Sequence, residues 1–157
     1  MYDVNFDLLV LDVNAVLTKG AIEFMQKYAY ELSDSGMVVS QQILPDGDKD
    51  IKSHVPYANP YFKCDITPSI VYDNIINLEK YHDGKILELN WAPLFCVYLK
   101  SDVLDSFQFE VNNSFEDLSL SNILSDYVRY VKGLKIYHIS DAFVYNIADK
   151  NIFDWGD

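Results

Sequence analysis

Hydrophobic residues in the first part of the chain form short continuous runs separated by a helical pattern. Val, Leu and Phe crowd residues 4–13 without helical spacing, which predicts a buried strand. Between residues 15 and 34 the apolar positions recur every three or four residues, which predicts an amphipathic helix ending before Gly36. A second strand is expected over 37–44, where β-branched residues return.

Proline and glycine divide the middle of the chain. Most of the prolines fall in residues 45–68, so we expect a long Pro/Asp-rich loop there, and long loops in compact domains are often functional. The pair Asp83-Gly84 lies between apolar runs at 70–81 and 85–91. Because Asp-Gly is a strong hairpin signal, these runs are predicted to form two antiparallel strands.

The last part of the chain holds the clearest helical pattern. Apolar residues share one face over 119–132, and Gly133 stands where a helix terminator belongs. A short helical turn is expected at 101–104. Further strands are predicted at 94–100, 107–111, 134–139 and 143–147.

These elements predict an α+β fold in a single globular domain spanning residues 1–157, because a chain of 157 residues is close to the commonest domain size. Hydrophobic residues make up 50% of the chain, enough for a packed core. We expect a mixed or largely antiparallel sheet of five to seven strands, with the helices 15–34 and 119–132 packed on one face.

The charge of the chain limits the classes of partner that it can bind. It carries 24 acidic and 12 basic residues, a formal net charge of -12, and the surplus of acid lies before residue 50 and after residue 100. With Arg129 as the one arginine, binding to nucleic acid or to an anionic membrane surface is disfavoured. No basic leader and no apolar stretch of about 20 residues is visible, so we expect a soluble, cytoplasmic protein.

One segment suggests chemistry. Residues 8–18 read LLVLDVNAVLT, with a carboxylate at Asp12 after an apolar run. This segment resembles the first motif of the haloacid dehalogenase-type phosphatases, and the resemblance implies an aspartate nucleophile at Asp12 with magnesium beside it. The family's second aspartate is replaced by Asn14, which cannot transfer a proton. We therefore expect no enzyme, and keep a degenerate phosphatase of this type as an alternative.

The acidic cluster of the long loop alternates carboxylates at Asp46, Asp48 and Asp50, as calcium loops do. Ile51 stands where an EF-hand needs glycine, and Tyr57 where it needs glutamate, which favours a solvated loop or a partner-binding tip.

Histidines and cysteines show no zinc-ligand spacing, and Cys64 and Cys96 are expected to be buried, reduced side chains. The six glycines form no nucleotide-binding pattern. We expect no metal and no cofactor.

Excess acid combined with 12 Tyr and 9 Phe leads to two hypotheses. The first is an acidic binding protein, an immunity or antidote protein that blocks a cationic toxin such as a nuclease, helped by steered association. The second is a structural or assembly protein, for example a viral component, with a Tyr-rich contact surface. A monomer or small homo-oligomer is expected. The candidate partner-binding residues are Asp46, Asp48, Asp50, Asp102, Asp105, Glu110, Glu116 and Asp117.

Overall fold

A computed structural model describes residues 6–43, 78–105, 107 and 117–146, with the backbone alone for 78, 80 and 117–119. The helical segments are α1 (Ala21–Glu31), η1 (Leu78–Tyr81), η2 (Ser101–Val103), α3 (Asp117–Asp126) and the π-helical turn η3 (Tyr127–Val131). The strands are β1 (Leu8–Leu11), β2 (Ala15–Leu17), β3 (Ser35–Ile43), β4 (Ile86–Leu89), β5 (Cys96–Leu99) and β6 (Lys135–Asn146). Among the described helices, none is both long and apolar enough to cross a bilayer.

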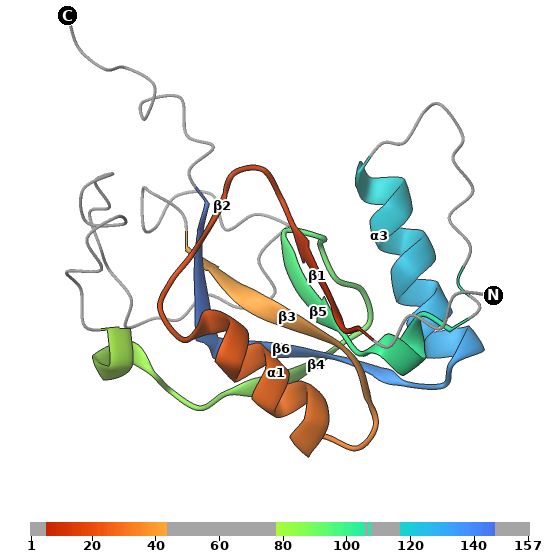
Figure 1. The fold of residues 1–157 in the computed structure, drawn as a ribbon, viewed down its shortest axis with the longest axis horizontal. Coiled ribbons are helices and arrows are strands. Elements are labelled where there is room, and N and C mark those ends of the chain that lie inside the picture. Colours follow the sequence, from red (N-terminus) through yellow and green to blue (C-terminus); the bar gives the residue numbers. More distant parts are fainter. Residues whose placement is uncertain (1–5, 44–77, 106, 108–116, 147–157) are drawn as a thin grey trace, which may run out of the picture.

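The strands form one six-stranded mixed sheet, as predicted for an α+β fold (Figure 1). Its order is β1-β5-β3-β6-β2, and β4 also pairs with β6. β3 and β6 run parallel, and the other pairs are antiparallel. β1 and β2 lie at opposite ends of this order, although only Asp12 to Asn14 separate them in sequence. The sheet therefore curls into a barrel-like form.

The two main helices cover opposite faces of the sheet, so the prediction that they share one face is wrong. Val38 of β3 belongs to a core cluster with Met25 of α1. Its neighbour Val39 belongs to another cluster, with Leu124 of α3 and Val128 of η3. Successive side chains of a strand point to opposite faces, so a strand that is apolar on both faces needs a cover on each.

The helix predicted over 15–34 begins later than expected. Residues 15–17 form β2, which pairs with β6, and α1 starts after Gly20, whose φ is 87°. The Thr18 hydroxyl donates a hydrogen bond to the Phe143 carbonyl oxygen at 2.7 Å. Pairing with a strand far away in sequence thus overrides the local helical spacing.

The Asp83-Gly84 pair does not form the predicted hairpin. Residues 78–81 are a 3-10 turn, and 70–77 lie outside the described residues. The Asp141 carboxylate accepts the backbone N–H groups of Asp83 at 2.9 Å and Gly84 at 3.2 Å. This loop is therefore fixed to β6, at the point where the β3–β6 register shifts, instead of reversing onto a preceding strand.

Other predicted elements are confirmed. The segments 37–44 and 94–100 correspond to β3 and β5, and the turn at 101–104 to η2. The helix 119–132 is α3 continued by η3, ending at Gly133 with φ 64°. The last two predicted strands are one strand, β6, with its register shift between them. The loop 45–68 and all of 107–111 except Phe107 lie outside the described residues.

Candidate partner-binding site

Two of the predicted partner-binding carboxylates meet on the turn that follows β5. Asp102 belongs to η2 and Asp105 follows it, and both are exposed. Val103 between them is fully buried in the core cluster below α3 and η3. An apolar side chain thus anchors the turn while its carboxylates face solvent.

Hydrogen bonds from both sides hold this turn. The Ser101 N–H donates to Asp7 Oδ1 at 2.9 Å. On the other side, Lys132 Nζ donates to the carbonyl oxygen of Asp102 at 3.0 Å, and the Tyr127 hydroxyl donates to that of Asp105 at 3.1 Å. A turn fixed in this way loses little conformational freedom on binding.

Asp7 is the centre of a cluster of hydroxyl groups beside the turn. Its carboxylate accepts the Tyr98 hydroxyl and, at 2.7 Å, the Tyr30 hydroxyl. Burial by itself raises the pKa of Asp7, but these two hydroxyls, the Ser101 N–H and the charge of Lys100 together hold that pKa below its usual value. Asp7 is therefore ionised at neutral pH.

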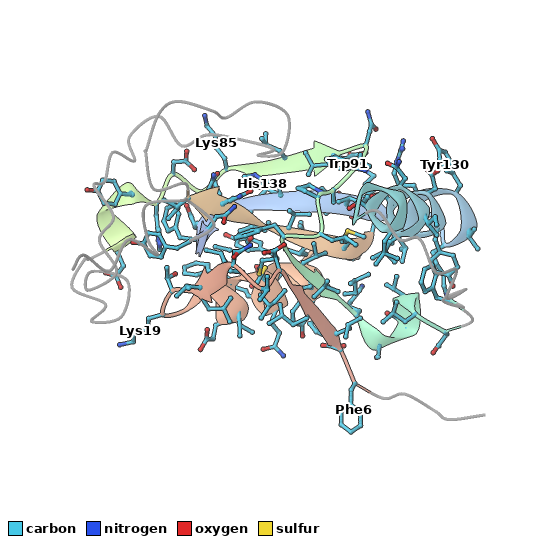
Figure 2. All side chains as sticks on the ribbon, turned by 90° about the horizontal axis from the view of Figure 1, so that it is seen from above. Phe6, Lys19, Lys85, Trp91, Tyr130 and His138 are labelled. Carbon is cyan, nitrogen blue, oxygen red and sulfur yellow. The ribbon has the colours of Figure 1, made fainter. Side chains whose placement is uncertain are left out.

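Two exposed aromatic residues adjoin Asp7, one in sequence and one through a hydrogen bond. Phe6, next to Asp7, is 79% exposed and points away from the ribbon in Figure 2, while Tyr30 of α1 is 59% exposed. The hydrogen bond to Asp7, and to a smaller extent the charge of Asp102, raise the pKa of Tyr30. Tyr30 is linked to the turn through Asp7, which accepts both the Tyr30 hydroxyl and the Ser101 N–H. Tyr130 projects from the opposite side of the molecule (Figure 2).

The described carboxylates divide into two groups. Several are used within the fold: Asp34 and Glu88 pair with Lys135 at 3.2 and 3.1 Å, Asp12 and Asp141 accept backbone N–H groups, and Asp7 holds the hydroxyl cluster. Within the described residues, the carboxylates of Glu23, Asp102 and Asp126 accept no hydrogen bond and form no ion pair. These three belong to different elements, so charge alone does not single out one face.

Within its described residues, the structure does not place any of the other predicted site residues at this turn. Asp46, Asp48, Asp50, Glu110 and Glu116 lie outside the described residues. Asp117 begins α3, and its side chain is outside the description too.

Sequence reasoning missed the cluster of Asp7, Tyr30 and Tyr98 beside the turn. These residues come from separate parts of the chain, and no spacing in the sequence connects positions 7, 30 and 98. Only the pairing of β1 with β5 and the packing of α1 across them bring these residues together.

Asp12, the residue that resembles a phosphatase nucleophile, shapes the turn between β1 and β2. Its Oδ1 accepts the N–H of Asn14 at 2.7 Å, and its carbonyl oxygen accepts the N–H of Ala15 at 3.0 Å. The described residues contain no group of three or more His, Cys, Asp or Glu side chains able to hold a metal ion.

The described thiol and the buried imidazole are both uncharged near neutral pH. Cys96 is buried, as predicted, and burial raises its pKa to about 11, an effect that the nearby Ser40 hydroxyl opposes only in part. Burial also lowers the pKa of His138 to about 4, against the opposing charge of Asp83. Neither group is a ready nucleophile or base for an outside substrate, because both side chains are inside the core.

Comparison with protein-family models, with curated protein sequences and with solved structures found no match to this chain.

We expect Asp7→Asn to lower the free energy of unfolding by about 1–3 kcal/mol at neutral pH, because a hydrogen-bonded charge is lost. The pKa of Asp7 is lowered by folding, so this contribution is complete above the ordinary aspartate pKa of about 3.9 and disappears as pH falls through the folded-state pKa. Urea denaturation of both proteins across this range measures it.

The matched control is Asp126→Asn, since the Asp126 carboxylate is exposed and holds no donor. It should change stability by less than about 0.5 kcal/mol at any pH. A difference between wild type and Asp7→Asn that persists unchanged into strong acid would contradict the role given to Asp7.

Proposed function

We propose that this chain neutralises a basic protein partner, as an immunity or antidote protein that blocks a cationic toxin such as a nuclease. The observation that carries the proposal is the η2 turn, which presents the exposed Asp102 and Asp105 on a rigid support, next to Asp7 and the exposed Tyr30, whose hydroxyl Asp7 accepts. Carboxylates steer a cationic partner and aromatic side chains anchor it, so this combination suits such an interface.

The local charge of the turn supports the proposal. Two lysines are close by: the Lys132 ammonium donates to the Asp102 carbonyl oxygen, and the charge of Lys100 helps to lower the pKa of Asp7. The three carboxylates Asp7, Asp102 and Asp105 outnumber these two lysines, so the turn carries a small excess of negative charge. The net charge of -12 over the whole chain adds a long-range attraction for any cationic protein, which weakens as salt screens it.

The test begins with the immobilised full chain in a lysate of its host, and with basic proteins that elute as salt is raised. We expect one of them to be a nuclease or other toxin whose activity the chain inhibits. The double variant Asp102→Lys/Asp105→Lys should weaken that inhibition about tenfold or more, mainly through slower association. Inhibition titrations and surface plasmon resonance at low and moderate salt measure the change.

A matched variant separates the site from net charge. Glu23→Lys/Asp126→Lys makes the same change in charge at two carboxylates on α1 and α3 that no described residue engages. It should weaken inhibition much less than the η2 variant. Equal losses of inhibition in the two double variants would show that the partner responds to net charge and not to the η2 turn. Failure of the chain to inhibit any retained basic protein would reject the proposed function.

Assembly into a larger structure is a second candidate, favoured by an apolar stripe on α3 and η3. Ile123, Tyr130 and Val131 are 50%, 71% and 70% exposed and follow helical spacing. In this case copies of the chain should associate through the stripe, and light scattering should show oligomers that persist at high salt and dissociate on Tyr130→Ser.

A further inference from the structure

β1 packs against core clusters on both faces of the sheet, but it lies at the end of the strand order. Within the described residues it pairs only with β5, through four register positions from Leu8↔Leu99 to Leu11↔Cys96. Leu9 packs into the core on the α1 side, whereas Leu8 and Val10 pack into the core on the α3 side. On each face of the sheet, the edge of β5 therefore offers apolar packing sites, called slots below, that fit the alternating side chains of β1.

The connection from β1 to β2 is a tight turn between two ends of the sheet (Figure 1). Two local hydrogen bonds accepted by Asp12, from the N–H groups of Asn14 and Ala15, hold it, and Val13 at its tip is 92% exposed. If this turn straightens, β1 can leave β5 while every other strand pair keeps its partner.

Asp7 fixes β1 in place with donors that belong to the rest of the molecule. The two tyrosine hydroxyls come from β5 and α1, and the Ser101 N–H comes from η2. All three converge on a carboxylate that precedes β1 by one residue. The binding site for β1 at the β5 edge therefore has two parts: apolar surfaces that receive the side chains of β1 on both faces, and three donors that bind the Asp7 carboxylate.

We propose that β1 is an exchangeable strand, and that β1 of a second copy of this chain can occupy the β5 edge in place of the copy's own. The slots and the three donors fit this chain's own sequence and register, which identifies the occupant. All contacts of β1 are identical in the closed monomer and in the exchanged dimer, so the balance between them depends on the turn and on concentration. This proposal is independent of the proposed function.

The native Cys96 provides a direct test. Asp12 N–H donates to the Phe95 carbonyl oxygen at 2.8 Å, so Asp12 and Phe95 are a hydrogen-bonded pair and Leu11 and Cys96 are the next, non-hydrogen-bonded pair. Such pairs have Cα atoms about 4.5 Å apart, within the range of a disulfide. Leu11→Cys in a Cys64→Ser background should therefore form a disulfide with Cys96 whenever β1 occupies a β5 edge.

Light and heavy-isotope forms of this variant are mixed under reducing conditions at high concentration, incubated, diluted and then oxidised. Mass spectrometry of the linked peptides shows whether position 11 is joined to Cys96 within one copy or between a light and a heavy copy. We expect links between copies that increase with concentration and incubation time.

Asp7→Asn, added to this background, separates exchange from ordinary surface association. It should raise the rate at which mixed links form by roughly fivefold or more, because β1 is released more easily. It should leave the final fraction unchanged, because the same contact is lost in monomer and dimer. Asp126→Asn should change neither quantity. Links confined to single copies at every concentration, or mixed links whose rate ignores Asp7→Asn, would overturn the proposal.

A measurement without introduced cysteines covers the case in which Leu11→Cys does not fold. The wild-type full chain, concentrated and then diluted, should yield a dimer that converts back to monomer faster with Asp7→Asn, as seen by size-exclusion chromatography with light scattering. A monomer at all concentrations for both proteins would also overturn the proposal.

Discussion

Phe143→Ala should lower the free energy of unfolding by about 3–5 kcal/mol, the largest loss that we expect from a single truncation in this chain. Phe143 is 1% exposed and lies in a core cluster with Ile43 and Tyr145. Its ring is 5.7 Å from that of His82, so it also supports the loop that is fixed to β6. Removing it leaves a cavity that the flanking sheet cannot fill without moving several strands.

Phe6→Ala is the matched control for this substitution. It removes the same atoms from a side chain that is 79% exposed, and should change stability by less than about 0.5 kcal/mol. Urea denaturation followed by circular dichroism measures both variants. Similar losses for the two would mean that Phe143 is not buried as described.

Gly36→Ala should destabilise the protein by about 1–3 kcal/mol, although the same change at an open site with ordinary backbone angles stabilises by about 0.4–1 kcal/mol. A Cβ at Gly36 would lie 2.7 Å from Val128 Cγ1 and 2.8 Å from Leu134 Cβ. The Leu134 atom is attached directly to the backbone, so β3 would have to move away from the end of η3. Whether Gly36→Ala lowers or raises the free energy of unfolding therefore tests how closely Val128 and Leu134 approach position 36.

Two further variants show whether crowding is the cause. At Gly133 a Cβ would meet no atom within 4 Å, but φ is 64°, so Gly133→Ala should cost about 1 kcal/mol from backbone strain alone. Val128→Ala removes one of the two atoms that crowd position 36. The double variant Gly36→Ala/Val128→Ala should therefore lose less stability than the sum of the single variants. Strict additivity would argue against the contact.

Much of the secondary structure could be predicted because its signals are local. β5 is a continuous apolar run and β3 contains one at Met37–Val39, and such runs become strands buried on both faces. Gly133 ends the last helix as expected, since its φ of 64° is one that glycine adopts without strain. The errors fall where distant partners compete: β2 pairs with β6 in a stretch that has helical spacing, and Asp141 captures the amides of the expected hairpin turn.

The candidate site was predicted only in part, for a related reason. The charge pattern nominated Asp102 and Asp105, and the structure places both on one exposed turn; whether they bind a partner stays a prediction. The same pattern could not show that Asp34 and Glu88 both pair with Lys135, since these residues come from three separate parts of the chain. Ion pairing between distant residues is decided by strand pairing, which one sequence does not display.

The sequence by itself determined an acidic α+β domain with its main strands and its second helix, because apolar periodicity, glycine stops and net charge depend on residues close together in the chain. Only the tertiary structure decided that the helices cover opposite faces and that β1 and β2, neighbours in sequence, lie at the two ends of the strand order. It also decided that Asp7 accepts two tyrosine hydroxyls next to the η2 turn. These features follow from which strands pair, and pairing depends on the fit of whole surfaces far apart in sequence.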